Sequence, residues 1–279
     1  MVTALVTPSH SVLELGGRFG TTSCALTGAT ANSGRVCSVE VDHTVRPAAL
    51  ANRAAHKCNF ALLGGSVSAE TLRVTSYSSY ATETRVVSDG AKATHIVPRI
   101  SFADLEARLG WRIDTLLIDC EGCISSLLGA ADDGRILDGI RLILMEHDLP
   151  WRVGHGGYGS YFALFRRRGF EQVWLSIDTF DHHQPWSRMM KHSAWVRTRG
   201  GTAPAVGDSA LASLRRACPE FARVRNYSHS RLACLDPRVD DPVGVAFNDS
   251  VRFRDMSDRS MERAIHPQVG AWPHVPRIV

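Results

Sequence analysis

Short apolar segments alternate with helix-like segments through the first two hundred residues of this 279-residue chain. The segments expected as strands are residues 11–15, 35–41, 60–67, 114–118 and 140–145. The segments expected as helices are residues 21–30, 45–57, 102–109, 123–128 and 158–168. Apolar strands separated by helices are typical of a mostly parallel sheet with helices on both faces. We therefore predict an α/β fold, with a loop or hairpin at 71–100 and an antiparallel pair at 172–177 and 194–197.

The composition changes after residue 200. Residues 200–204 are typical of a linker, and residues 208–217 are compatible with one helix. From residue 237 onward the chain is rich in Pro, Asp and Arg and has weak periodicity, which favours an extended tail or cap. We predict a main domain over residues 1–200 and a C-terminal extension over residues 201–279.

Composition and cysteine usage exclude some classes of protein. The net charge is +4 without a long basic run, so nothing demands a nucleic-acid partner. The seven cysteines are odd in number and irregularly spaced, which argues against a disulfide framework. We predict that Cys24, Cys37, Cys58 and Cys120 are small core residues in a reducing compartment. No signal peptide and no apolar run near the ~18 residues of a membrane span is visible, so we expect a soluble cytoplasmic protein.

The first expected strand runs into a glycine-rich turn, Glu14-x-Gly16-Gly17-x-x-Gly20. Glycines allow close approach of the backbone to a ligand, and the following helix offers free amide groups. A dinucleotide site needs the spacing G-x-G-x-x-G, but Arg18 stands where the second glycine belongs. An acid two residues before the first glycine is more typical of a methyltransferase, where it holds the sulfonium and amino end of S-adenosylmethionine. The alternative is a tight turn with no ligand.

A second acid ends the next expected strand. Glu40 lies twenty positions after Gly20, where a carboxylate accepts both hydrogen bonds of a ribose diol. The alternative is a surface acid that caps the following helix, and this interpretation fits Asp42 better. Glu40 together with the glycine turn is more specific than either feature alone.

Two acids and a glycine follow the apolar strand at 114–118, namely Asp119, Glu121 and Gly122. Acids are costly at such a place unless water, a partner or a ligand reaches them. Asp119 is expected to face the methionine end of the cofactor or the methyl acceptor, and the alternative is a helix N-terminal cap. Cys120 and Cys123 form a lone C-x-x-C pair, which is poor evidence for zinc or redox chemistry, so we predict no metal.

His147 follows the apolar strand at 140–145 and lies between Glu146 and Asp148. A histidine beside two carboxylates is a candidate general base, since they raise its pKa. The alternative is a histidine that caps the end of the strand.

This order of motifs resembles the FkbM family of methyltransferases over about residues 12–198. The most specific piece is Ile-Asp-Cys-Glu-Gly-Cys at 118–123, which is similar to the family's Ile-Asp-Val-Glu-Gly-Ala. Residues 14–20 and 144–147, together with Glu40 and Asn52, also match family positions. Arg18 replaces the family's usual Asn, and Ile124 stands where a second Glu is common.

The resemblance implies a Rossmann-like methyltransferase fold with a mostly parallel seven-stranded sheet. It implies S-adenosylmethionine as cofactor, S-adenosylhomocysteine as product, and a hydroxyl of a small molecule or glycan as acceptor. Glycines 16, 17 and 20 and Glu14 would hold the methionine portion, Glu40 the ribose, and Ser66 with Val67 the adenine. The general base is Asp119, Glu121 or His147.

Other functions stay open at this point. Arg18 and Ile124 motivate a non-catalytic binding module with the same fold. An RNA 2′-O-methyltransferase commonly uses a Lys-Asp-Lys-Glu tetrad, and the chain has few lysines. A nicotinamide dehydrogenase is disfavoured by the glycine spacing. The sequence does not indicate the oligomeric state.

Overall fold

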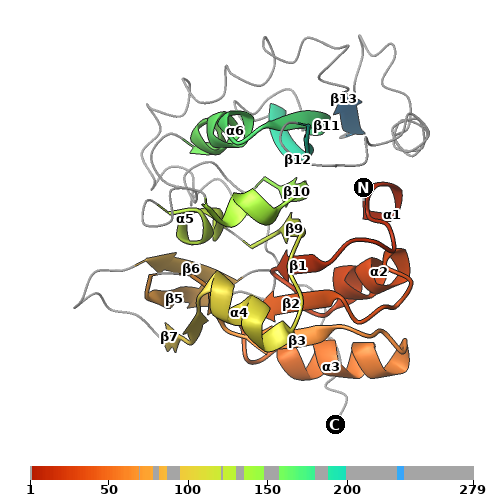
Figure 1. Ribbon diagram of the computed structural model, residues 1–279. Helices are drawn as coiled ribbons and strands as arrows, with labels where there is room; N and C mark the ends of the chain where they lie inside the picture. Colours follow the sequence, from red (N-terminus) through yellow and green to blue (C-terminus); the bar gives the residue numbers. More distant parts are fainter. Residues whose placement is uncertain are drawn as a thin grey trace.

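One eight-stranded sheet forms the framework, in the order β13-β11-β12-β10-β9-β1-β2-β3 (Figure 1). The computed structural model describes residues 2–68, 70–77, 82–86, 95–120, 122–129, 135–147, 157–179, 188–198 and 231–235. The strands are β1 (Val12–Leu15), β2 (Val36–Glu40), β3 (Ala61–Gly64), β9 (Thr115–Ile118), β10 (Leu142–Glu146), β11 (Phe170–Thr179), β12 (Arg188–Arg197) and β13 (Arg231–Leu235). Strands β3, β2, β1, β9 and β10 are parallel, and β12, β11 and β13 continue the sheet by antiparallel pairing.

Helices cover both faces of this sheet (Figure 1). They are α1 (Val2–Leu5), α2 (Thr21–Ala29), α3 (Arg46–Ala55), α4 (Phe102–Leu109), α5 (Ile124–Leu127) and α6 (Gly157–Arg167), with a 3-10 turn at Arg135–Gly139. Side chains alternate between the faces of a strand. Leu13 and Ile118 therefore share one core with residues of α4, α5 and α6, whereas Val12 and Leu117 share the other with residues of α1 and α2.

The order of the strands reverses between β1 and β9. The chain passes from β1 to β2 and β3 in one direction, then returns to β9 and β10 on the other side of β1. In open parallel sheets the carboxyl ends of the strands at such a reversal form the ligand crevice. The predicted Rossmann-like methyltransferase fold is confirmed, and β13 from the predicted C-terminal extension adds an eighth strand.

The strand predicted over residues 60–67 is broken at Gly65. This glycine has φ +151, and a Cβ there would lie 2.4 Å from the carbonyl oxygen of Pro98. The chain leaves the main sheet after β3, and β4 (Ser66–Val67) pairs with β8 (Arg99–Ile100) instead. Of the two possibilities predicted for residues 71–100, a loop or a hairpin, the structure has the hairpin: β5 (Leu72–Tyr77) pairs with β6 (Thr82–Val86), and β7 (His95–Val97) joins β5. The predicted helix at 208–217 lies outside the described residues.

The prediction of small core cysteines without a disulfide framework is wrong for Cys24, Cys58 and Cys120. Cys24 on α2 is disulfide-bonded to Cys58, which precedes β3, with their Cα atoms 5.3 Å apart. Cys120 is bonded to Cys123. The first pair is 34 residues apart in sequence, so only the packing of α2 beside the start of β3 reveals it. Cys37 is free and buried, and burial raises the pKa of its thiol to about 12.

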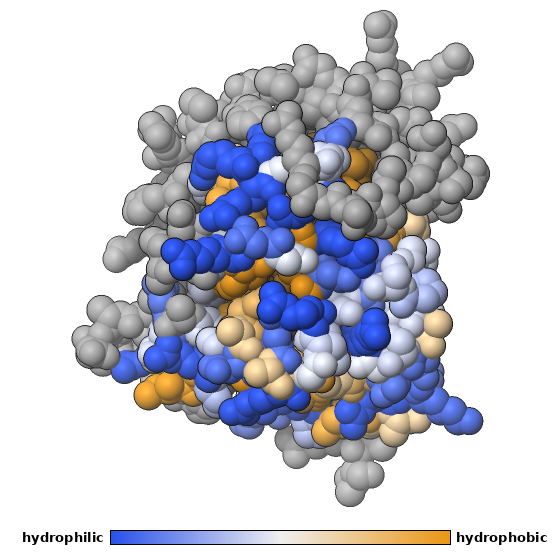
Figure 2. Space-filling model, in the orientation of Figure 1, coloured by the Kyte–Doolittle hydropathy of each residue, from blue (hydrophilic) through white to orange (hydrophobic). Residues whose placement is uncertain are grey.

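The described surface is chemically mixed. Figure 2 shows hydrophilic side chains over most of the described surface on the side viewed in Figure 1, with hydrophobic side chains between them near the middle. Within the described residues, no helix combines the length and apolar character that crossing a membrane requires.

The partly buried carboxylate of Asp114 joins the amino ends of three adjacent strands. Asp114 accepts a hydrogen bond from the Ser11 amide at 3.0 Å, just before β1. Its other oxygen forms an ion pair with Arg141, just before β10, and the exposed fractions of the two side chains are 20% and 30%. Asp114 itself precedes β9, so one side chain aligns the starts of β1, β9 and β10.

Asp114→Ala should therefore lower the free energy of unfolding by about 1–3 kcal/mol, because it leaves the Ser11 amide and the Arg141 guanidinium without their shared acceptor. Urea denaturation followed by circular dichroism measures the change. Asp138→Ala is the matched control, since Asp138 pairs with Arg168 but is 62% exposed. The control should cost no more than about 1 kcal/mol. Equal losses in the two variants would contradict the proposed alignment.

Candidate functional site

The glycine turn after β1 packs tightly against both neighbouring strands. Gly16 has φ +93, and a Cβ there would lie 1.6 Å from the carbonyl oxygen of Asp119. A Cβ on Gly17 would lie 1.9 Å from Oγ of Ser38 on β2. The amides of Gly16 and Gly17 both donate to the Val39 carbonyl at 3.0 Å. The two glycines are therefore required by crowding of the strand ends as well as by any approach of a ligand.

The turn leads into the unprotected start of α2. Gly20 is the N-cap residue and has φ 78. No side chain caps the helix, and its first turn contains no acidic residue. Such a helix start favours a polar or negatively charged group of a ligand. It also faces the crevice end of the sheet, because the turn directly follows β1 (Figure 1).

Glu14 is completely buried on β1 and belongs to a small polar cluster. Ser23 of α2 donates a hydrogen bond to Oε2 of Glu14, and Oγ of Ser23 lies 3.1 Å from Oγ of Ser38. Oε1 of Glu14 has no hydrogen-bond partner among the described residues. Burial raises the pKa of Glu14 to about 7, against the opposing effect of the hydrogen bonds from Ser23 and Ser38. Glu14 is thus a carboxyl that changes charge near neutral pH.

The two serines of this cluster were not among the predicted site residues. Ser38 pairs directly with Glu14 in the β1–β2 register, and both point to the same side of the sheet. Strand β2 is buried at all five positions. A serine inside such a strand could have indicated the cluster, because a buried hydroxyl needs a hydrogen-bond partner.

Glu40 ends β2 and holds the glycine turn in place. Its Oε2 accepts a hydrogen bond from the Arg18 amide at 2.6 Å, and its Oε1 accepts one from the Asp42 amide at 2.7 Å. Burial raises the pKa of Glu40, and the two backbone hydrogen bonds oppose that rise. A carboxylate has about four acceptor positions, so the two amides leave room for further donors. Asp42 accepts from the amide and hydroxyl of Thr44 and does not cap α3, whose N-cap is Val45.

Ser66 and Val67 are brought to the same end of the sheet. The amide of Gly65 donates to the carbonyl of Glu40 at 3.1 Å, so the chain passes beside Glu40 as it leaves β3. Ser66 is 7% exposed and Val67 is 4% exposed, and both belong to β4. Both side chains are largely covered, and their assignment to the adenine stays a prediction.

Asp119 lies directly against the glycine turn. Its amide donates to the carbonyl of Leu15 at 2.9 Å, and its own carbonyl is the atom that excludes a side chain at position 16. The Asp119 residue is half-buried at the end of β9. Glu121 lies outside the described residues.

His147 is buried among aromatic rings at the end of β10. His147 is 3% exposed. Its ring centroid lies 4.8 Å from that of Tyr158 and 5.5 Å from that of Phe162. Its Nε2 lies 2.8 Å from Oγ of Ser193 on β12, which also accepts from the indole of Trp195 at 3.0 Å. These contacts favour the alternative in which His147 is a structural residue at the end of the strand.

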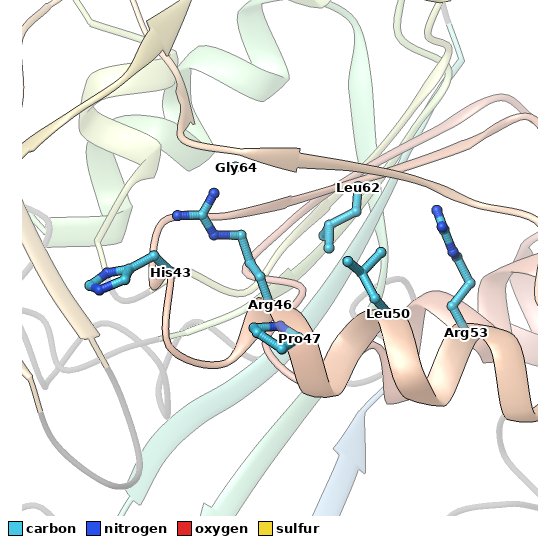
Figure 3. A pocket seen from close by; sticks show the side chains of 7 residues that line it. All are labelled: His43, Arg46, Pro47, Leu50, Arg53, Leu62 and Gly64. Carbon is cyan, nitrogen blue, oxygen red and sulfur yellow. The ribbon is translucent and has the colours of Figure 1, made fainter.

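A separate surface pocket of about 480 Å³ lies between α3 and β3 (Figure 3). Its polar lining consists of His43, Arg46 and Arg53, and its remaining lining residues are Pro47, Leu50, Leu62 and Gly64. The Arg46 guanidinium lies against Gly64, where a Cβ would be 1.8 Å from Nη1 (Figure 3). None of the predicted site residues lines this pocket. Among the described residues no cluster of three or more His, Cys, Asp or Glu side chains is placed to hold a metal.

Comparisons with known proteins do not assign the chain to a family. No family model matches the chain. No curated protein matches it in sequence. The fold therefore rests on the strand order described above, and the resemblance to the FkbM family stays a prediction.

Solved structures that share the general arrangement are distant in sequence. The precorrin-6y C5,15-methyltransferase of Geobacter metallireducens is 9% identical, with 71% of this chain and 84% of that chain covered and a TM-score of 0.41. Fibrillarin of Aeropyrum pernix, in complex with S-adenosyl-L-methionine, is 16% identical, with coverages of 69% and 68% and a TM-score of 0.42. An O-methyltransferase of Bacillus cereus is 12% identical, with coverages of 70% and 78% and a TM-score of 0.42.

Glu14 gives the site a pH-dependent stability that can be measured. Because the folded-state pKa of about 7 lies above the ordinary value, the folded chain loses stability from this group as the pH rises from about 4.5 through 7. Glu14→Gln removes the titration. The unfolding free energy of the parent chain minus that of this variant should fall by about 2–3 kcal/mol between pH 5 and pH 8, measured by urea denaturation. Parallel pH profiles for the two chains would show that Glu14 is ionised throughout.

Proposed function

We propose that the chain is an S-adenosylmethionine-dependent methyltransferase that acts on a hydroxyl group of a small molecule or glycan. The observation that carries this proposal is the meeting of three strand ends at the reversal of the strand order. Gly16 after β1 touches the backbone of Asp119 after β9, and the amide of Arg18 is held by Glu40 at the end of β2. The glycine turn is thus held between the Glu40 carboxylate, which is suited to a ribose, and the backbone of Asp119, whose side chain we assign to the reacting end.

The residues present fit this cofactor. Glu14 keeps one buried oxygen without a partner among the described residues, close to the turn where the cationic amino end would lie. The first turn of α2 has no side-chain cap and can receive the carboxylate of the methionine portion. Glu40 would accept hydrogen bonds from the ribose diol. Ser66 and Val67, beside Glu40, would border the adenine.

The chemistry needs few groups from the protein. When bound, S-adenosylmethionine supplies a methyl group on a positively charged sulfur, which an oxygen attacks in line. Gly16 and Gly17 would position the methionine end, and the crevice would hold the acceptor oxygen near the methyl group. A base at the crevice takes the hydroxyl proton as the new bond forms.

Among the three candidate bases we favour Asp119. It is half-buried rather than fully covered, and its backbone borders the glycine turn. His147 is buried, and its Nε2 is already within hydrogen-bond distance of Ser193. In this proposal His147 supports the wall of the acceptor side, together with Tyr158. Membership of the FkbM family is part of the same proposal, and it is supported by Asn52, whose amide donates to the Phe19 carbonyl and ties α3 to the glycine turn.

Calorimetry with S-adenosylhomocysteine tests the cofactor. We expect binding at sub-millimolar ligand. Glu40→Ala should weaken it by about 1–3 kcal/mol, since a buried contact to the ribose and the tether of the turn are both lost. Glu106→Ala is the control, because Glu106 is a buried carboxylate that holds the Ile113 amide at 2.8 Å, remote from the turn in sequence and on α4. No heat of binding for the parent chain would refute the cofactor, and an unchanged affinity in Glu40→Ala would refute the ribose contact.

Transfer of a labelled methyl group to a panel of hydroxyl compounds tests the enzyme and its base. Asp119→Asn should lower the rate of transfer by about 10²–10⁴-fold, the usual contribution of a general base, while S-adenosylhomocysteine affinity changes little. His147→Gln should lower the free energy of unfolding. It should leave the dependence of the rate on pH unchanged. If the cofactor binds and no compound in the panel is methylated, a non-catalytic binding module becomes the better proposal.

A further inference from the structure

The segment that follows Asp119 is closed by a disulfide. Cys120 and Cys123 are bonded, with Cα atoms 5.4 Å apart, and the amide of Cys123 donates to the carbonyl of Cys120 at 3.3 Å. Both cysteine residues are only partly buried, unlike the buried thiol of Cys37. The pair is therefore less shielded than Cys37, although both cysteines pack against the core.

The same segment forms a wall of the glycine turn. The Cβ position of Gly16 lies 1.6 Å from the Asp119 carbonyl oxygen and 3.3 Å from the Cα of Cys120. The backbone of residues 119 and 120 is thus packed directly on the turn. A change in the backbone at Cys120 therefore changes the surface against which Gly16 rests.

The second disulfide is placed differently. The bond between Cys24 and Cys58 joins α2 to the segment before β3. The two cysteines are 34 residues apart in sequence. That bond braces two elements of the framework. The Cys120–Cys123 bond spans only three positions, so it constrains the local backbone of one loop instead of the fold.

We propose that Cys120 and Cys123 are a thiol–disulfide exchange site that controls the cofactor turn. A thiolate of a dithiol reductant attacks one sulfur of the pair, and the other sulfur leaves as a thiolate. The second thiol of the reductant then attacks the mixed disulfide and releases the cysteine as a thiolate. Two electrons and two protons thus pass to the cysteines, and the reductant becomes a cyclic disulfide. Oxidation by a low-molecular-weight disulfide reverses the exchange.

Opening the bond loosens the wall of the turn. The disulfide restricts the positions that Cys120 and Cys123 can take relative to each other. Without it, the segment must be ordered whenever a ligand is held between the turn and the end of β9, which costs conformational entropy. The oxidised chain therefore binds S-adenosylhomocysteine about tenfold more tightly than the reduced chain. This expectation of an affinity change rests on the proposed function.

Calorimetry with S-adenosylhomocysteine tests the proposal in three samples, all of the full chain. They are the oxidised parent, the parent reduced with dithiothreitol, and the double variant Cys120→Ser/Cys123→Ser under oxidising conditions. The variant retains the Cys24–Cys58 bond, so it separates the two disulfides. Mass spectrometry after alkylation records which cysteines are open in each sample. We expect the reduced parent and the variant to bind about tenfold more weakly than the oxidised parent.

Amide hydrogen exchange provides a readout that needs no ligand. Exchange at residues 15–20 should become faster when the bond opens, in the reduced parent and in the double variant. If no sample binds S-adenosylhomocysteine but this exchange responds, the proposed cofactor is wrong and the control of the turn stands. Unchanged exchange at residues 15–20 with the pair shown to be open overturns the proposal, as does equal affinity in all three samples. If the variant does not fold, the comparison is decided by reduced parent samples in which alkylation shows Cys120 and Cys123 open and the Cys24–Cys58 bond intact.

Discussion

The rest of the site depends on the contact between Gly16 and the backbone at the end of β9. A side chain at position 16 would overlap the Asp119 carbonyl, so β1 and β9 can end side by side only because this residue is glycine. The same contact places the start of α2 and the candidate residue Asp119 at one edge of the sheet. It occurs at the reversal of the strand order, the place where open parallel sheets commonly bind ligands.

Beneath this contact the protein buries polar groups at a cost. Glu14 and Glu40 are both covered, and burial raises the pKa of each. The cost is offset in different ways: Glu40 accepts hydrogen bonds from two backbone amides, whereas Oε2 of Glu14 accepts one from the Ser23 hydroxyl. A core that satisfied packing alone would place apolar residues at these positions. Their burial beside the turn supports the proposed binding of a polar ligand there.

The fold was largely predictable because its signals are local. Apolar runs such as residues 114–118 and 140–145 specify strands, and Pro47 marks the start of α3 as expected. The predictions that failed depend on contacts between distant residues. The break after β3 arises because Gly65 packs on Pro98, and the Cys24–Cys58 bond arises because α2 lies beside the segment before β3. The choice between the two roles weighed for His147 likewise depends on its neighbours in space, which include Ser193 and Tyr158.

The sequence by itself determined the alternation of strands and helices, the glycine turn and the acids at the ends of the strands, because periodicity and turn chemistry act over a few residues. Only the tertiary structure decided which of these groups meet. It paired Glu14 with Ser38 and Ser23, gave the amide of Arg18 to Glu40, and set the Cys120–Cys123 loop against Gly16. The physical reason is that burial and hydrogen bonding depend on neighbours in space, and the register of parallel strands chooses those neighbours.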